Sequence, residues 1–511
     1  MVSDGSGERA AASDSATGRT IVHLVHNAFT HDTRVLSEAR SAAESGDSVV
    51  VAAVSGRDLP DREEDAGVRT IRFSFDPVDT RLWRNRSRVS RPWRFRRQAA
   101  GWLTARSSGG HAERARALLG LLGAIAVLPW VAVTMVYHYA LRLLDPLLRL
   151  IDLPPPSRVV GEWIEARARS VVFVGHRPLR LRDWGSRIER AVAVGELPRA
   201  DIWHADDLET LPLALGLRRR FGGRVVFDSH ELFLDAAGRV RMGWFRRAIL
   251  RAAERRWIVR ADAVVTVNRA VAAELRRRYG IAMPVVVRNC RPLWSPPQGF
   301  TSPLRGAVVA AGLDPNRPIV IAHGGFQLER GFEETLAAMA DRTDVTVVFL
   351  GYGPLAERFR AIAATPPWHG RLAVLPPVAP DEVVPWLAGA DVSACLIQPT
   401  TLNHRLSTPN KLFEAIMAGV PIVASDLPAI AEIVTTFGVG RLVRPGDRAA
   451  TAAAIDAFLA MSDEERAKQR GRARQAATTE INWEHEFAAL AAVYDSLVPP
   501  ITAAGPGSTP R

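Results

Sequence analysis

A lysine and a glutamate near residue 410 have types and a spacing that suit the binding of anions and hydroxyls. The stretch STPNKLFEAIMAGVPIVASD, residues 407–426, contains Lys411, one of only two lysines in 511 residues, and Glu414 three positions later. Thr408 fits a helix N-cap and Pro409 fits the first helical position. Lys411 and Glu414 would then share one face at the start of a helix, where a lysine opposes the helix dipole unless an anion lies there.

A diphosphate would remove this electrostatic mismatch. Phosphate oxygens accept hydrogen bonds from the free amides at a helix start and from a lysine ammonium. One turn further along, Glu414 is placed to accept hydrogen bonds from neutral hydroxyls such as those of a ribose. The residues therefore predict a nucleoside diphosphate lying across the helix start. The alternative is an i,i+3 ion pair between Lys411 and Glu414 on a surface helix.

Short β-branched runs alternate with amphipathic helical patterns in both halves of the chain, which is typical of parallel α/β folds. The first half offers TIVHLVH, ADIWHA and RVVFDS as strands, and the second half offers RPIVIAHG, DVTVVFLG and VPIVAS after a Pro-rich passage at 291–306. The pattern predicts two doubly wound domains that face a cleft, with ligands at the carboxyl ends of the strands. In chain order we expect a disordered tail at 1–18, an acceptor-side domain at 19–297, a nucleotide-sugar-binding domain at 298–480, a helix at 481–498 that packs back across the interface, and a disordered tail at 499–511.

An insert at about 79–190 interrupts the first domain. Residues 81–98 hold eight arginines, interleaved Trp and Phe and no acid, and residues 118–141 contain no charged side chain. A basic aromatic run beside a long apolar segment suits an anionic membrane surface. A single crossing would separate the two flanks of one sheet, so we expect a re-entrant or in-plane helical hairpin broken at Pro129. The alternatives are a buried helical hairpin for the apolar segment and a solvated loop for the basic run.

The composition limits the class of protein. A hydrophobic content of 47% with 23% charged residues indicates a folded chain with large cores. Much of the net charge of +12 lies in residues 81–98, which argues against a nucleic-acid-binding protein. The two cysteines, Cys290 and Cys395, form neither a disulfide framework nor a paired metal motif, which fits a reducing cytosol. The polar N-terminus lacks the apolar core of a signal peptide.

The segment PNKLFEAIMAGVPIVASD resembles the donor site of glycosyltransferase family 4, retaining enzymes of the GT-B fold with two Rossmann-like domains. Further landmarks stand in the family's order: ADIWHADDLETLP, FDSHELF, ADAVVTVNRAVAAELRRRYG, HGGFQLERGFEETLAAMA and FLGYGP. The resemblance covers most of residues 19–496 apart from the insert, and it points to the subgroup with HEL and PxKxFE motifs. It implies a UDP-, GDP- or dTDP-linked sugar as donor and no metal or other cofactor.

On the donor side, the resemblance implies that Glu414 binds the ribose. Arg330 matches the second of two basic residues that grip the diphosphate, while Gly325 occupies the position of the first. Phosphate binding would then depend on Arg330 and Lys411 together. The first glutamate of the family's paired motif is replaced by Leu406, which puts sugar selectivity in question. The donor-binding residues implied are Gly325, Arg330, Asn410, Lys411, Leu412 and Glu414.

On the acceptor side, two family motifs are present with changes. WHADDLETL corresponds to a pattern with two histidines, of which His204 matches the first and Asp206 replaces the second. His230 belongs to the HEL motif, and its alternative is a hydrogen-bonded core histidine. The implied catalytic residues are Asp206, His204 and His230, and the implied acceptor-side residues are Asp32 and Arg34 of a DxR pattern, Asp207 and Glu231.

These observations predict a retaining glycosyltransferase, peripheral or monotopic on the cytoplasmic face of the membrane, that moves a sugar to a lipid-linked or envelope-polysaccharide acceptor. Arg330, Lys411 and helix amides would neutralise the departing diphosphate. One alternative is a soluble enzyme that glycosylates a small metabolite. Another is a non-catalytic GT-B scaffold that binds a sugar nucleotide.

Overall fold

The structure is a computed structural model in which part of the chain is described. The described residues are 18–30, 32–56, 58–74, 181–236 and 242–499. The chain divides into two compact units, Ser74–Arg187 and the remainder. The predicted basic run, the predicted apolar segment and nearly all of both predicted tails lie outside the described residues. Among the helices that are described, none is long and apolar enough to cross a membrane.

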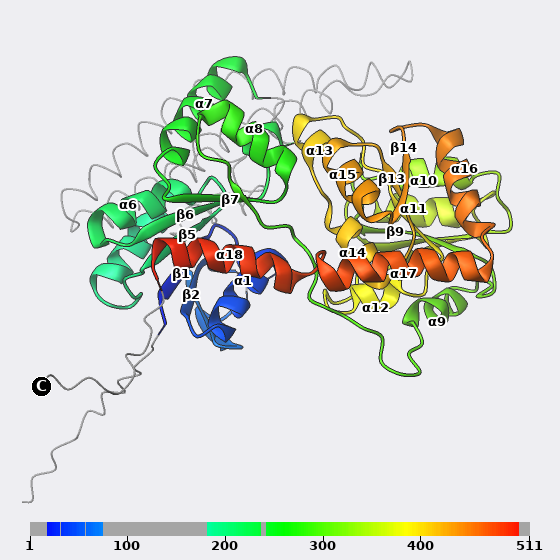
Figure 1. Cartoon of the computed structure of the whole chain (residues 1–511), viewed down its shortest axis with the longest axis horizontal. Coiled ribbons are helices and arrows are strands. Elements are labelled where there is room, and N and C mark those ends of the chain that lie inside the picture. Colours follow the sequence, from blue (N-terminus) through cyan, green and yellow to red (C-terminus); the bar gives the residue numbers. More distant parts are fainter. Residues whose placement is uncertain (1–17, 31, 57, 75–180, 237–241, 500–511) are drawn as a thin grey trace, which may run out of the picture. The chain divides into compact units, whose positions relative to one another are not determined.

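The strands described in the N-terminal half form one eight-stranded sheet (Figure 1). Its order is β3-β4-β2-β1-β5-β6-β7-β8, and its neighbours are parallel except for the β3–β4 pair at the edge. The order reverses between β1 and β5, so the carboxyl ends of these strands form a topological switch point. The strands are β1 (Thr20–Val25), β2 (Ser48–Val54), β3 (Arg62–Asp65), β4 (Val68–Phe73), β5 (Ile202–Asp206), β6 (Arg224–Ser229), β7 (Ala263–Thr266) and β8 (Val285–Val286).

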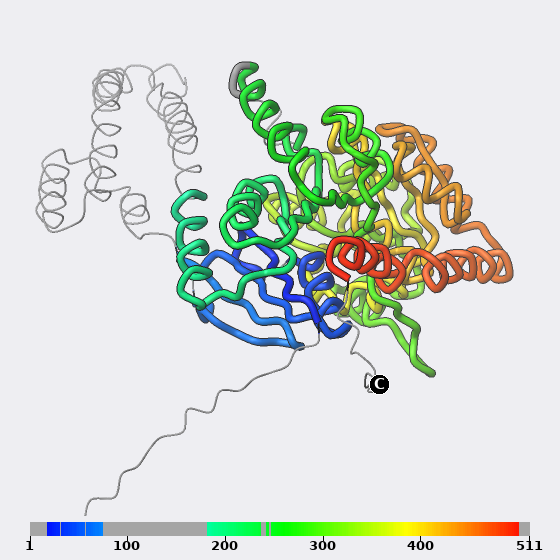
Figure 2. Tube along the Cα trace, turned by 60° about the vertical axis from the view of Figure 1, so that its left-hand side comes forward, coloured from blue at the N-terminus to red at the C-terminus, as the bar shows by residue number. Residues whose placement is uncertain are grey.

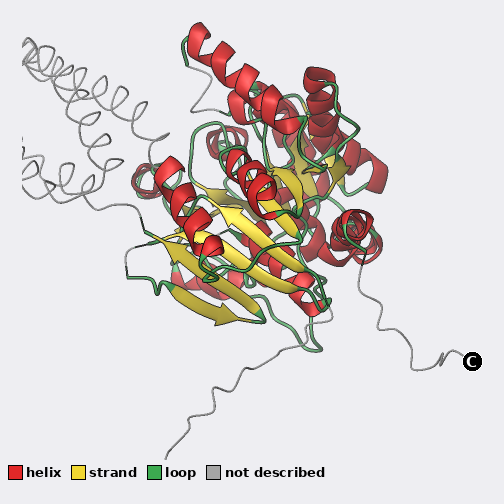
Figure 3. Ribbon diagram, turned by 90° about the vertical axis from the view of Figure 1, so that its left-hand side faces the viewer, coloured by secondary structure: helices red, strands yellow, loops and turns green. Residues whose placement is uncertain are grey.

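Helices pack on both faces of this sheet (Figure 3). On one face, Val35 and Ala39 of the first helix join the β-branched residues of β1 and β2 in a hydrophobic core. Burying each such Val stabilises the fold by about 1.5–3 kcal/mol, which is why the local β-branched pattern predicts these strands well. The helical elements of this half are α1 (Thr33–Glu44), α6 (Leu211–Phe221), the 3-10 turn η2 (Phe233–Asp235), α7 (Trp244–Ile258) and α8 (Arg269–Tyr279).

The C-terminal half contains a six-stranded, wholly parallel sheet in the order β11-β10-β9-β12-β13-β14. Its order reverses between β9 and β12, which makes their carboxyl ends the second switch point. The strands are β9 (Ile319–Gly325), β10 (Thr346–Tyr352), β11 (Leu372–Leu375), β12 (Val392–Cys395), β13 (Ile422–Ser425) and β14 (Gly440–Val443). The helices are α9 (Pro303–Ala310), α10 (Phe332–Met339), α11 (Ala356–Ala363), α12 (Val383–Leu387), α13 (Leu402–Leu406), α14 (Asn410–Ala418), α15 (Pro428–Phe437), α16 (Arg448–Leu459) and α17 (Asp463–Thr479).

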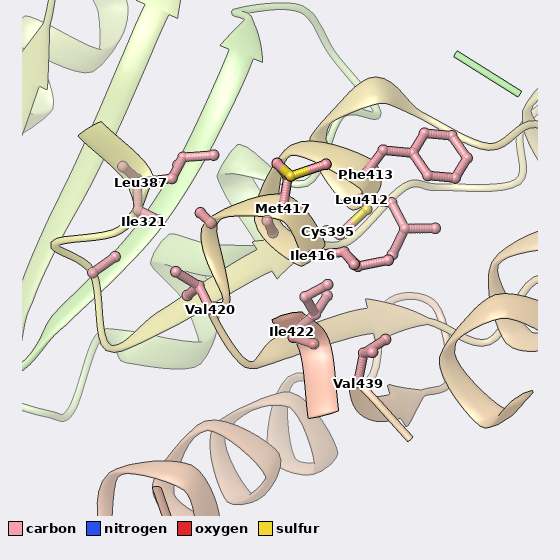
Figure 4. Close-up of a cluster of buried hydrophobic side chains, with 14 of the residues drawn as sticks. Ile321, Leu387, Cys395, Leu412, Phe413, Ile416, Met417, Val420, Ile422 and Val439 are labelled. Atoms are coloured by element: carbon pink, nitrogen blue, oxygen red, sulfur yellow. The ribbon is translucent and has the colours of Figure 1, made fainter. Parts of the chain in front are cut away.

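A hydrophobic core lies on each face of the second sheet. On one face, Leu412 and Ile416 of α14 pack with Cys395 and Ile422 of the strands (Figure 4). On the other face, aromatic rings of the β9–α10 segment, β10 and α11 meet with centroids 5.0 to 6.4 Å apart. Helices α10 and α14 therefore lie on opposite faces of the sheet, and both begin beside the β9–β12 switch point.

The last helix, α18 (Trp483–Leu497), brings the chain back to the first sheet. It packs against α1 and β8, while α17 packs against α14 (Figures 1 and 2). Tyr494 and Leu490 of α18 belong to the core of the N-terminal sheet. The predicted parallel α/β fold class is confirmed by the two sheets, whereas the predicted helical insert lies outside the described residues and stays a prediction.

Candidate functional site

Helix α14 begins at the second switch point without a side-chain cap. Its N-cap is Pro409, and the prediction that Thr408 caps it is wrong. Thr408 is buried and its hydroxyl accepts a hydrogen bond from Asn268 Nδ2 at 3.3 Å. Because proline offers no side-chain acceptor, no side chain caps the first amides of α14. Uncapped amides at a helix start attract anions.

Lys411 is a buried cation at this helix start. Its side chain is 7% exposed, and its Nζ donates to the carbonyl oxygen of Arg330 at 3.1 Å and lies 4.8 Å from the centre of the Phe332 ring. In the described part of the chain, no carboxylate forms an ion pair with it. Burial, together with the nearby positive charge of Arg330, lowers the pKa of Lys411 to about 8. An anion at this position would stabilise the ammonium.

The carboxylate of Glu414 is held from two sides. Arg291 donates to Oε1 through Nε at 3.0 Å and also through Nη2, and Nε2 of His323 is 2.8 Å from Oε2. Burial alone would raise the pKa of Glu414, but the hydrogen bond from His323 and the charge of Arg291 lower it to about 2. Lys411 and Glu414 are both buried and have different partners, so the alternative of a surface ion pair between them is wrong.

The glycine loop after β9 lies next to Lys411. A Cβ on Gly324 would be 4.0 Å from Cε of Lys411, and Gly325 ends the strand. Gly331, the N-cap of α10, has φ +92°, and a Cβ there would meet Leu396 at 2.9 Å, so this position requires glycine. Helix α10 also begins without a side-chain cap. Arg330 immediately precedes this second uncapped helix start.

Two predicted donor-side residues, Leu412 and Asn410, have surroundings that differ from those of Lys411 and Glu414. The side chain of Leu412 is fully buried in the hydrophobic core beside α14, so only the backbone of this residue could contact the donor, and the predicted donor contact stays a prediction (Figure 4). One helical residue turns the side chain by about 100°, so Leu412 lies on a different part of the helix surface from Lys411. Asn410 is exposed, and its Oδ1 accepts from Asn289 Nδ2 at 2.9 Å. Leu406, at the position of the missing glutamate, ends α13.

A second group of polar side chains lies at the switch point of the N-terminal sheet. The register pairs His23 of β1 with His204 of β5, and Asp206 of β5 with Asp228 of β6. All four are buried on the face toward α1, where Arg34 is buried too. Arg34 donates to both oxygens of Asp228, at 2.7 and 3.1 Å. This region is therefore an internal network of charged and hydrogen-bonded groups.

Arg34 and His204 use their polar atoms within this network. The predicted contact of Arg34 with an acceptor and the predicted catalytic role of His204 are therefore corrected. Arg34 also pairs with Glu38 at 3.1 Å and donates to the carbonyl of Val287, so its guanidinium is not available to an acceptor. No part of His204 is exposed, and its Nδ1 is 2.6 Å from the hydroxyl of Tyr494. Burial lowers the pKa of His204 well below its usual value, which keeps the ring neutral. A ring with no exposed surface cannot contact a sugar directly.

The buried group offers metal-ligand types, but its geometry suits a polar network better. Side chains of His23, Glu38, His204 and Asp206 offer one ligand atom each within 4.8 Å of one another. The two imidazole rings, however, stack with centroids 4.5 Å apart and planes only 19° from parallel. Imidazole lone pairs lie in the ring planes, so stacked rings do not direct them at one ion. The nearby Arg34 also opposes a second cation.

His230 and Asp207 are the more accessible members of the acceptor-side set. His230 is partly exposed, with Nε2 3.2 Å from Asp228 Oδ2 and Nδ1 3.7 Å from Asp207 Oδ1. Burial alone would lower its pKa, but the carboxylates of Asp207 and Asp228 raise the pKa of His230 well above its usual value. Asp207 has φ +69° and a half-exposed side chain. The alternative of a core histidine fits His230 only in part.

The remaining predicted residues cap elements or join segments. Asp206 is 2% exposed, and burial raises its pKa to about 6, so a direct role beside a sugar is corrected to a role behind His230, 3.8 Å away. Asp32 is the N-cap of α1 and accepts from the amide of Val35. Glu231 accepts from Nδ2 of Asn403 in α13, whose Oδ1 accepts from the amide of Leu232 at 2.9 Å.

Sequence reasoning missed several partners in both groups. His323 directly precedes the glycine loop on β9, so its place at a strand end could have marked it. Glu38 lies one helical turn from Arg34, so its i,i+4 spacing could have marked it too. Three further partners show no local signal because they reach the site from distant parts of the chain. They are His23, Arg291 and Tyr494.

Two family models match this chain. The model of the Glycosyltransferase Family 4 domain matches residues 147–290, and that of the Glycosyl transferases group 1 domain matches residues 317–461. The chain is a glycosyltransferase, and the match over residues 147–290 makes it similar to family 4 enzymes. A comparison with curated proteins gave no match.

Solved structures share the fold. Sucrose-phosphate synthase from Thermosynechococcus elongatus is 17% identical, with a TM-score of 0.61 over 94% of this chain and 99% of that one. HepE from Anabaena in complex with UDP-glucose is 13% identical, with a TM-score of 0.58 over 94% and 100%. The catalytic domain of starch synthase IV from Arabidopsis thaliana, bound to ADP and acarbose, is 11% identical, with a TM-score of 0.59 over 94% and 99%. These glycosyltransferase neighbours support the GT-B fold of this chain.

Proposed function

We propose that the chain is a retaining glycosyltransferase whose nucleotide-sugar donor places its diphosphate at the starts of α10 and α14. The observation that carries the proposal is the buried ammonium of Lys411, which has no carboxylate ion-pair partner among the described residues and lies beside Arg330 and two uncapped helix starts. A diphosphate brings the negative charge that this site lacks. Glu414, ionised and fixed, accepts hydrogen bonds from the ribose hydroxyls.

In this mechanism the chain acts mainly on the leaving group. Arg330, Lys411 and the helix amides stabilise the charge that develops on the diphosphate as the glycosidic bond breaks. The transferred sugar keeps its anomeric configuration, and no metal or other cofactor is required. The half-exposed Asp207 and the partly exposed His230 are the acceptor-side groups that we assign to sugar or acceptor hydroxyls. Asn410 and the glycine loop at Gly325 line the donor.

The donor nucleotide is left open among UDP, GDP and dTDP. HepE is known in complex with UDP-glucose and starch synthase IV with ADP, which supports a nucleotide-sugar donor without selecting the base. The deciding experiment incubates the purified protein with UDP-, GDP- and dTDP-sugars and measures nucleotide release with and without a membrane extract. Release that is specific to one nucleotide and stimulated by the extract supports the proposal. No release and no nucleotide binding in any condition contradicts it.

We further propose that the acceptor is lipid-linked or an envelope polysaccharide and that the enzyme binds the cytoplasmic face of the membrane. The support is the sequence of residues 81–98 and 118–141, a basic aromatic run followed by an uncharged apolar segment. Sedimentation with vesicles that contain anionic lipid, compared with neutral vesicles, tests this for the full chain and for a variant that lacks residues 79–150. Equal partitioning of both proteins would favour a soluble enzyme acting on a small metabolite.

A further inference from the structure

One arginine between the two sheets holds the carboxylate that we assign to ribose recognition. Arg291 lies in the segment that connects β8 to α9, and both its Nε and its Nη2 donate to Oε1 of Glu414. The side chains of Arg291 and Glu414 are only 16% and 7% exposed. On the opposite side, His323 contacts Oε2 at 2.8 Å. The carboxylate is therefore clamped between the connecting segment and β9.

The number of acceptor sites shows what the clamp leaves free. An ionised carboxylate offers about four lone-pair sites on its two oxygens. The two N–H groups of Arg291 occupy Oε1, and Nε2 of His323, which must carry the hydrogen because a carboxylate only accepts, occupies one site on Oε2. Oε2 keeps a further site for a hydroxyl donor. The clamp fixes where that site points.

The same segment is anchored where the chain returns to the first sheet. The carbonyl of Arg291 accepts from the amide of Trp483, the first residue of α18, at 2.9 Å. Three residues earlier, Arg288 donates to Glu486 of α18 through Nε and through its backbone amide, each at 2.6 Å. Arg291 thus links Glu414 to the two segments that connect the sheets, the β8–α9 segment and the start of α18.

We infer that Arg291 is a positioning residue for the ribose of the donor, acting through Glu414 and not through the diphosphate. This inference rests on the proposed function of the α14 site. Its consequence is selective, because losing Arg291 should weaken recognition of the ribose hydroxyls while leaving the contacts of Lys411 and Arg330 with the phosphates in place. A purely structural role for Arg291 would weaken all ligands alike.

The experiment measures ribose discrimination by calorimetry. UDP, GDP and ADP are compared with their 2′-deoxy forms on wild type, Arg291→Met and the control Arg288→Met, which loses an arginine of the same segment paired with a glutamate other than Glu414. We expect wild type to bind its preferred nucleotide about tenfold more tightly than the 2′-deoxy form, as for one hydrogen bond to a charged group. Arg291→Met should reduce this ratio to about twofold or less with unchanged affinity for the 2′-deoxy form, whereas Arg288→Met should keep it.

Each outcome has a clear meaning. If Arg291→Met weakens both nucleotides equally, or if wild type shows no discrimination, the positioning role is wrong. If wild type binds none of these nucleotides and does not bind dTDP either, the proposed function itself fails. Should Arg291→Met not fold because Glu414 is left buried without its arginine, Glu414→Gln is compared with the double variant Arg291→Met/Glu414→Gln. If the single variant Glu414→Gln and the double variant bind every nucleotide with equal affinity, Arg291 acts only through Glu414. A lower affinity of the double variant overturns the inference.

Discussion

The two switch points of this molecule treat charge in opposite ways. At the N-terminal sheet, the buried guanidinium of Arg34 is matched by Asp228 and Glu38. At the C-terminal sheet, the buried ammonium of Lys411 has a backbone carbonyl and an aromatic ring as partners but no carboxylate in an ion pair within the described residues. Burying a charge without an oppositely charged partner destabilises the folded state, so such a charge indicates a function other than folding. Buried charges with an oppositely charged partner therefore support the fold, whereas the buried charge without such a partner marks the ligand site.

The largest expected effect is on the matched side. Arg34→Met leaves Asp228 and Glu38 buried without their cation, and we expect the free energy of unfolding to fall by about 3–5 kcal/mol. Urea denaturation measures this loss. The control is Arg40→Met, which removes an exposed pair with Asp65 and should cost less than about 1 kcal/mol. If Arg34→Met lowers the free energy of unfolding as little as the control does, the matched charges at the N-terminal sheet do not support the fold.

The unmatched side should show the reverse pattern. Lys411→Ala removes a cation that the fold itself does not need, so we expect nucleoside diphosphate affinity to fall by about 10- to 100-fold, as for a charge-assisted hydrogen bond of 1.5–3 kcal/mol. The free energy of unfolding should change little. Calorimetric titration and urea denaturation measure the two quantities. Lys468→Ala, at the exposed second lysine, is the matched control and should alter neither. Equal diphosphate binding by Lys411→Ala and wild type would remove Lys411 from the site.

Diphosphate affinity should also depend on pH in a defined direction. The pKa of Lys411 is about 8 in the free protein, and a bound diphosphate raises it, so binding is strongest when the ammonium is already present. Affinity should begin to fall about one pH unit below 8 and should fall by up to about tenfold per pH unit above it. Glu414, with a pKa of about 2, and Cys395, with burial raising its pKa to about 11, do not titrate between pH 7 and 9. A profile for Lys411→Met that falls as steeply as that of wild type would contradict this assignment.

The smallest expected effect tests whether Tyr494 of α18 supports only the network at the N-terminal sheet. Tyr494→Phe deletes the hydroxyl that is bonded to Nδ1 of His204, and we expect a loss of about 1 kcal/mol in the free energy of unfolding. Thermal denaturation detects a change of this size. Nucleoside diphosphate affinity should stay the same, because Tyr494 packs on the N-terminal sheet. A large loss of affinity would show that the two regions are coupled more strongly than the comparison assumes.

Particular residues show how far local sequence reaches. The alternation of β-branched runs and amphipathic segments predicts the parallel α/β class because both patterns follow from local periodicity. The helix that begins near residue 410 is also predicted, since Pro409 limits where it can start. The edge strand β3, with the exposed sequence REED, has no apolar alternation and could not be recognised. Its pairing with β4 is a property of the sheet and not of its own residues.

Local sequence was enough for the alternation of strands and helices, for the fold class, and for the presence of a lysine and a glutamate at one helix start. Only the tertiary structure decided which charges are matched. Glu414 is held by Arg291, 123 positions away, and His204 by Tyr494, 290 positions away. Such partners depend on strand order and on the return of α18, so no local pattern contains them. The physical reason is that periodicity decides which face a side chain occupies, while the packing of distant elements decides what it meets there.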